Sequence, residues 1–235
     1  DNPSSGDITS EQAIYIQQVF NDLAAKTGSR NSSISNGYPS IIDVPSFIDY
    51  MIIAEIASNA DSYQFSTYFH KDKGGKLRAG PVWDYNLTYG NDLFLWGFDR
   101  SFYDVWQFDY ENTGAKFWKD LFLDPTFKCY WAKRWFQLTA ANGPLHYNTI
   151  ENKIDAYLNL LSESQTREQQ RWDTVTEQSN NITAMKSWIK NRINWINNTV
   201  GSSANCNNVS TPNLVITKIN YHPLEDGDFS SKDLE

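Results

Sequence analysis

Two aspartates, Asp61 and Asp84, stand where regular structure is expected to end. Asp61 follows an apolar stretch with helical character, and Asp84 follows a segment that alternates like a strand. Carboxylates at such positions can orient a hydroxyl or hold a divalent metal ion, which is what phosphoryl transfer asks of a protein. Helix, acidic loop, hairpin and second acidic loop is also the order in which protein kinases present their base and their metal ligand.

On the residues alone, a purely structural role for both aspartates remains open. Asp is common in turns after helices and often caps the element that follows a strand. The chain has 28 acidic residues, so two aspartates near element ends also arise without a catalytic role. Asn59, two positions before Asp61, is predicted to be the C-cap of the preceding helix.

The segment before Asp61 is predicted to be a buried helix. Residues 46–58 read SFIDYMIIAEIAS and leave almost no polar face, which is typical of a helix surrounded by other elements. Ser46 and Asp49 are three positions apart and fit a capping box at its start. We therefore expect Asp61 to follow a rigidly held helix end.

A β-hairpin is predicted between the two aspartates. Residues 64–70 and 76–83 alternate in polarity, and Lys-Asp-Lys-Gly-Gly between them supplies a turn. Pro81 has no backbone N–H, which favours an edge strand or a strand about to end. Asp84 is thus expected just past the second strand.

The rest of the chain is predicted to be mainly helical. Residues 92–114 read as a long ordered loop, a kind of connection that is often functional. The spacing of the apolar residues predicts helices at residues 10–27, 116–123, 147–171 and 184–200, and one more that begins at residue 125. The expected fold class is mainly α with a small β-hairpin.

The net charge of −8 excludes some classes of partner. An acidic protein lacks the basic surface that grips nucleic acid or anionic lipid, so no nucleic acid is expected as a partner. A phosphate-bearing ligand would need a metal ion or a local basic patch. No stretch approaches the roughly 20 apolar residues of a transmembrane helix.

The two cysteines, Cys129 and Cys206, are 77 positions apart and have no CxxC or histidine neighbour. This spacing argues against a zinc site or a redox motif. It favours two unrelated thiols over a single disulfide and leaves both arrangements open.

Two stretches, FIDYMIIAEIASNADSY and STYFHKDKGGKLRAGPVWDYNLTYGN, resemble the core of the CotH family of spore-coat-H-like atypical protein kinases. The shared features are an N-x-D loop, a hairpin and a G-P-V-W-D segment. The resemblance extends more loosely to about residue 200. It implies a kinase-like fold, ATP with Mg²⁺ or Mn²⁺ as cofactors, and phosphorylation of a protein substrate by a secreted or cell-surface protein.

The resemblance also assigns roles to individual residues. It makes Asp61 the catalytic aspartate and Asp84 the metal-binding aspartate, 23 positions later. Ser66 and Asn86 are the further candidate metal ligands. Ser66 stands where some members have Asn, and Asn86 stands where many have a second Asp, so the metal site is less acidic than usual.

The resemblance further implies that part of the nucleotide site lies outside this chain. In the family, a β-rich lobe with the nucleotide-clamping lysine precedes the helix at 10–27. Lys26, Lys71, Lys73 and Lys76 lie in the wrong elements to replace that lysine. Residues 10–200 are therefore expected to be the C-terminal lobe of an atypical protein-kinase-like α+β fold, inactive when isolated.

The ends of the chain are expected to lie outside that lobe. Residues 1–9 and 201–212 have the composition of linkers. Residues 213–235 resemble the first strand of a lamin-tail-like β-domain.

A non-catalytic function is the alternative. The Ser and Asn at positions 66 and 86 also suit a pseudokinase scaffold or a surface-attachment and binding module. In that case Trp96 or Trp106 could stack on a sugar or a protein partner.

Overall fold

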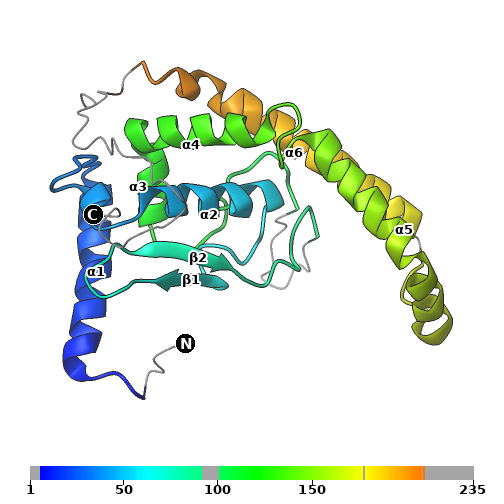
Figure 1. Ribbon diagram of the computed structural model, residues 1–235, viewed down its shortest axis with the longest axis horizontal. Helices are drawn as coiled ribbons and strands as arrows, with labels where there is room; N and C mark the ends of the chain where they lie inside the picture. The colour runs from blue at the N-terminus through cyan, green and yellow to red at the C-terminus, as the bar shows by residue number, and fades with distance from the viewer. Residues whose placement is uncertain (1–5, 92–100, 177, 208, 210–235) are drawn as a thin grey trace, which may run out of the picture.

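The computed structural model describes residues 6–91, 101–176, 178–207 and 209. As predicted, these residues are mainly helical with one small antiparallel sheet (Figure 1). The helices and strands are α1 (Ser10–Gly28), α2 (Val44–Ala57), β1 (Thr67–His70), β2 (Arg78–Val82), α3 (Phe117–Leu123), α4 (Pro125–Thr139), α5 (Tyr147–Trp172) and α6 (Gln178–Val200), with short 3₁₀ helices at Tyr38–Ser40 and Gly201–Asn205.

Helix α2 is the central element, between α4 and the hairpin (Figure 1). Most of its side chains are buried, as its composition predicts. It begins at Val44, so the predicted capping box at Ser46 is wrong. The cap is Asp43, whose Oδ1 accepts a hydrogen bond from the Ser46 amide at 2.9 Å. Pro45 fits the first turn because its missing N–H has no partner there.

A cluster of aromatic rings joins α2, α3 and the hairpin. Trp118 of α3 is fully buried, and its ring centroid lies 5.3 Å from Tyr50 of α2 and 5.7 Å from Phe69 of β1. It also lies 5.2 Å from Tyr63, just past the Asp61 loop. Large rings bury much apolar surface each, so this cluster holds the hairpin and the Asp61 loop against the helices.

The hairpin has the predicted order and is shorter than predicted. Thr67 pairs with Val82 and His70 with Arg78, with an irregularity between Thr67 and Phe69. Residues 64–66 belong instead to the turns after Asp61, because the Phe65 amide donates to the Asp61 carbonyl at 3.0 Å.

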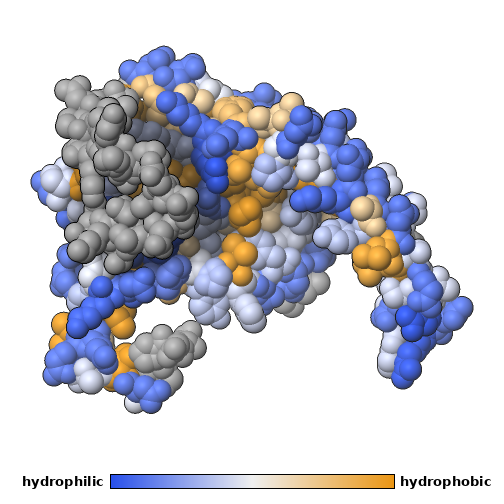
Figure 2. All heavy atoms as spheres, viewed as in Figure 1, coloured by the Kyte–Doolittle hydropathy of each residue, from blue (hydrophilic) through white to orange (hydrophobic). Residues whose placement is uncertain are grey.

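Helix α5 lies beside the first part of α6, and together they form an arm that projects from the body, whereas the second part of α6 packs into the body (Figure 1). No described residue of α5 is buried, and its Leu160 is 76% exposed. Figure 2 shows apolar residues in the middle of one face and a separate apolar group on the arm. Among the described residues, no helix has the length and apolar character needed to cross a membrane.

Cys129 of α4 and Cys206 form a disulfide, with their Cα atoms 5.3 Å apart. The prediction of two unrelated thiols is therefore wrong, and the alternative left open is the correct one. The cysteines meet because the 3₁₀ helix Gly201–Asn205 packs against α4. That contact depends on the tertiary fold, so spacing in the sequence could not reveal it.

Some predictions fall on residues whose structure is not described. These are the loop at 92–100 with Trp96 and the lamin-tail-like segment at 213–235. Trp106 is described and is partly buried at the edge of the core. It packs against Phe122 and Trp195, with ring centroids at 4.7 and 4.8 Å.

Candidate functional site

The Asp61 loop begins where α2 ends. Ser58 has a left-handed backbone (φ 49°) that stops the helix, so the C-cap is Ser58 and the prediction of Asn59 is wrong. The buried Asn59 donates through Nδ2 to Ser62 Oγ at 3.0 Å, which braces the loop from inside. Asp61 lies between these two residues in the chain and is half-buried.

The Asp84 loop follows β2. Asp84 has a left-handed backbone (φ 59°) and an exposed side chain. Asn86 is also exposed, and its carbonyl accepts a hydrogen bond from Asn91 Nδ2 at 2.9 Å. Both oxygen-bearing side chains thus lie at the surface, where a solvated ion can reach them.

Two backbone hydrogen bonds join the Asp84 loop to the Asp61 loop and to the end of α2. The Ala60 amide donates to the Leu87 carbonyl at 3.1 Å, and the Tyr89 amide donates to the Ala57 carbonyl at 2.7 Å. Ala60 directly precedes Asp61, and Leu87 is three positions after Asp84. The fold therefore brings the two loops side by side, as the order of the elements predicts.

Ser66 is placed differently from the other predicted ligands. It lies half-buried in the turn between Asp61 and β1, on the first of the two loops. Among the described residues, no group of three His, Cys, Asp or Glu side chains could hold a metal ion. Asp84, Asn86 and Ser66 nevertheless provide oxygen donors, which suit Mg²⁺ because this ion keeps several of its waters in protein sites.

Exposed apolar side chains lie next to Asp84. Trp83 is 61% exposed and Tyr68 of β1 is 40% exposed, and their rings meet edge to face at 6.3 Å. Val82 and Phe65 are also exposed. This surface of the hairpin offers ring faces on which a planar group could stack.

Two of the lysines named in the sequence analysis have local contacts. Lys26 donates to the Asn36 carbonyl, and Lys71 donates to the Gly75 carbonyl while lying over the Tyr15 ring. These contacts belong to α1, the loop after it and the hairpin turn.

A buried ion pair supports the Asp61 loop from behind. Glu55 of α2 and Arg192 of α6 are 2.8 Å apart, and both side chains are fully buried. Burial raises the pKa of Glu55, while Arg192 and the Gln107 amide act in the opposite direction. The sequence analysis missed this pair. Its one signal was an acidic residue inside the apolar run of α2, where an unpaired charge is very unfavourable.

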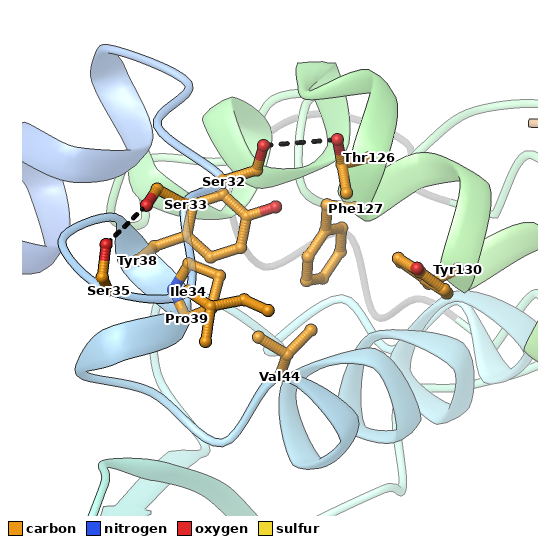
Figure 3. Close-up of a pocket in the computed structure, with 10 residues that line it drawn as sticks. All are labelled: Ser32, Ser33, Ile34, Ser35, Tyr38, Pro39, Val44, Thr126, Phe127 and Tyr130. Carbon is orange, nitrogen blue, oxygen red and sulfur yellow. Dashed lines mark hydrogen bonds between the residues drawn. The ribbon is translucent and has the colours of Figure 1, made fainter. Parts of the chain in front are cut away.

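A hollow of about 720 Å³ lies at the N-terminal end of α2, the end opposite the Asp61 loop (Figure 3). Apolar side chains and hydroxyl groups line it: Ser32, Ser33, Ile34, Ser35, Tyr38, Pro39, Val44, Thr126, Phe127 and Tyr130. Val44 begins the 14-residue α2, whereas Asp61 follows its end. The hollow is therefore about 20 Å from the acidic loops, and no carboxylate is among its lining residues.

A second hollow, of about 640 Å³, lies beside the Asp84 loop. Residues of the Asp84 loop line one side and residues of α6 the other, with Ser101 between the two segments in the chain: Asn86, Thr88, Tyr89, Gly90, Asn91, Ser101, Asn181, Ile182, Ala184, Met185 and Trp188. Its lining is neutral and rich in amides and hydroxyls.

The fold and this site define a class of protein: a mainly helical domain whose central helix and single hairpin present two acidic loops side by side. The chain belongs to the CotH family, since the family model described as CotH kinase protein matches residues 1–196. The resemblance seen in the sequence is thereby confirmed. No curated protein and no solved structure matches the chain.

Proposed function

We propose that the full-length protein containing this chain transfers the γ-phosphoryl group of ATP to Ser or Thr hydroxyls of a protein substrate. Family membership supports a kinase-related protein. The observation that carries the proposal is the hydrogen bond between Ala60 and Leu87, which holds the Asp61 and Asp84 loops together. Phosphoryl transfer needs one carboxylate at the acceptor hydroxyl and oxygen donors at the metal.

In this proposal Asp61 orients the acceptor hydroxyl and receives its proton. Its half-buried position suits a carboxylate held in a fixed direction. Asp84 holds Mg²⁺ or Mn²⁺, and Asn86 and Ser66 are the further oxygen donors. A bound divalent ion would neutralise the negative charge on the phosphate oxygens. In an acidic chain of net charge −8, such an ion would offset the repulsion of a nucleotide.

The proposal assigns residues 10–200 to the C-terminal lobe of the kinase-like domain. The nucleotide-clamping lysine then comes from another part of the full-length protein. Stacking of the adenine on the exposed Tyr68 and Trp83 rings would give this lobe a share in nucleotide binding. Residues 1–235 alone are expected to transfer little phosphate.

A secreted or cell-surface location is part of the proposal. The disulfide between Cys129 and Cys206 supports it, because such bonds persist in oxidising compartments and are rare in the cytosol.

A pseudokinase or binding module is the second candidate function. The low acidity of the metal site favours it, since Ser66 and Asn86 carry no charge. The neutral hollow between the Asp84 loop and α6 could then bind a partner through its amides and the Trp188 ring.

Calorimetry with a non-hydrolysable ATP analogue and Mg²⁺ separates the two candidates. The proposed kinase binds the analogue, loses metal-dependent binding when Asp84 becomes Asn, and keeps it when Asp61 becomes Asn. Asp72→Asn, in the hairpin turn, is the control. Full-length protein that shows no binding heat favours the binding module.

A further inference from the structure

Glu55 and Arg192 form an ion pair in the interior, although they are 137 positions apart in the sequence. Both side chains have zero exposure. Buried ion pairs are a weak source of stability, because removing two charges from water offsets most of their attraction. A well-packed apolar pair could fill the same space without this cost. The ion pair therefore calls for a role other than stability, and its hydrogen bonds indicate one.

Arg192 uses its other donors to fix backbone. Its Nε donates to the Glu55 carbonyl at 2.8 Å, and its Nη1 donates to the carbonyls of Tyr103 and Val105. The guanidinium thereby connects α6, the last turns of α2 and the segment that follows residue 101.

Glu55 collects three further hydrogen bonds. Its Oε2 accepts from the Gln107 amide at 3.0 Å, and its Oε1 accepts from the Phe108 amide at 3.3 Å. Its Oε1 also accepts from the Tyr63 hydroxyl at 2.8 Å. Four donors surround the carboxylate once Arg192 is included, which stabilises its ionised form.

These contacts reach both flanks of Asp61. On one side, Gln107 Nε2 donates to Ser58 Oγ at 2.7 Å. On the other side, Tyr63 is two positions after Asp61 and has a left-handed backbone (φ 74°). A non-glycine residue persists in that conformation only where its surroundings hold it, and the bond from the Tyr63 hydroxyl to Glu55 is such a restraint.

We propose that the Glu55–Arg192 pair is a positioning unit for Asp61 and acts through the Tyr63 hydroxyl. The proposal rests on the function proposed above, in which Asp61 acts on the acceptor. Catalytic groups must be held within roughly 0.5 Å of their productive geometry. Loosening the loop should therefore slow the transfer step and leave nucleotide binding unchanged.

Tyr63→Phe in the full-length protein tests this proposal. The substitution removes one hydroxyl and keeps the ring, which packs 5.2 Å from Trp118. Tyr38→Phe is the matched control, because Tyr38 is also buried and donates to a buried carboxylate, that of Asp124, at 3.0 Å (Figure 3 shows its place). Tyr38 lies at the opposite end of α2.

The expected result for Tyr63→Phe is a kcat lowered about tenfold or more, with KM for ATP within about twofold of the wild type. Tyr38→Phe should keep the wild-type kcat. Equal kcat values in the two variants would overturn the positioning role, because a merely structural hydroxyl would matter equally at both ends.

Hydrogen exchange provides a reading that does not depend on activity. Tyr63→Phe should speed exchange of the Ala60 and Ser62 amides, which bond to the carbonyls of Leu87 and Asn59, and Tyr38→Phe should not. Unchanged exchange in Tyr63→Phe overturns the proposal even if Asp61 proves catalytic. If the wild-type protein transfers no phosphate but Tyr63→Phe still speeds exchange, the result supports the positioning of the Asp61 loop and refutes the proposed kinase function.

Discussion

The backbone amide of Ala60 donates a hydrogen bond to the carbonyl of Leu87 at 3.1 Å. This bond joins the loop after α2 to the loop after β2, although a whole hairpin separates them in the sequence. Because backbone atoms form it, it constrains both loops whatever their side chains are. The bond therefore ties together the loops that carry Asp61 and Asp84, and most of the following predictions concern the contacts around these loops.

Removing one partner of the buried ion pair should be strongly destabilising. Arg192→Met leaves the Glu55 carboxylate buried without its cation, and such changes cost about 3–5 kcal/mol. The control is Arg134→Met, which breaks a half-exposed pair with Asp49 and should cost under about 1 kcal/mol. Urea unfolding of the chain measures the free energy of unfolding of both variants. Similar decreases in the two would contradict the claim that the buried pair matters more than the half-exposed one.

Gly114 should not tolerate a side chain. A Cβ at this position would overlap the Tyr63 carbonyl and lie 2.8 Å from Asn112 Oδ1. Asn112 Nδ2 itself donates to the Ser62 carbonyl at 2.9 Å, so residues 112–114 are in direct contact with the Asp61 loop. Gly114→Ala should cost about 1–3 kcal/mol.

Gly201→Ala is the control for Gly114, because a Cβ there meets nothing within 4 Å. Thermal unfolding of the two variants should show a lowered Tm for Gly114→Ala only. A Gly114→Ala chain as stable as the wild type would mean that the two segments are not in close contact.

Alkaline pH should unfold the protein through its buried tyrosines. Burial is the main cause that raises the pKa of Tyr38, Tyr50, Tyr63, Tyr85 and Tyr89 above the ordinary value of 10.0. A raised folded-state pKa gives stability that is fully present below about pH 10 and is lost as the pH rises further.

Urea midpoints measured from about pH 8 to pH 11 should therefore fall above about pH 10. The absorbance of ionised tyrosine should rise together with the loss of helical circular dichroism. Ionisation of all 13 tyrosines in a chain that keeps its helical signal would contradict the burial described here.

Reduction of the disulfide should lower stability without changing the acidic loops. The bond between Cys129 and Cys206 closes a loop of 77 positions, and loss of such a link costs about 2–5 kcal/mol. A reductant should thus lower the Tm of the wild type. A Cys129→Ser, Cys206→Ser double variant should have the lower Tm from the outset, and the reductant should not change it. A wild type insensitive to reductant would refute the bond.

The sequence was sufficient for the parts of the fold that depend on local pattern. The apolar run that includes Phe47 and Ile52 predicts a buried helix, and the Lys-Asp-Lys-Gly-Gly turn predicts the hairpin. Element ends were less accurate, because side-chain hydrogen bonds decide them. Asp43 replaced Ser46 as the N-cap of α2, and Ser58 replaced Asn59 as its C-cap.

The contacts between distant segments could not be predicted from the sequence. Arg192 lies in a helix with many polar residues, several of them exposed, and nothing nearby in the sequence marks it as buried. Its partner Glu55 stood out only as a charge within an apolar run. The disulfide was missed for the same reason, since the packing of Gly201–Asn205 on α4 brings Cys129 to Cys206. The order of the elements did predict that the Asp61 and Asp84 loops converge.

The most direct test of the central claim is transfer of radiolabelled γ-phosphate from ATP by the full-length protein with Mg²⁺ or Mn²⁺, onto itself and onto dephosphorylated casein. The account predicts transfer by the wild type and by Asp72→Asn, a fall of about a hundredfold or more in Asp61→Asn, and loss of metal-dependent transfer in Asp84→Asn. Transfer by Asp61→Asn at the wild-type rate would contradict the catalytic role of this loop.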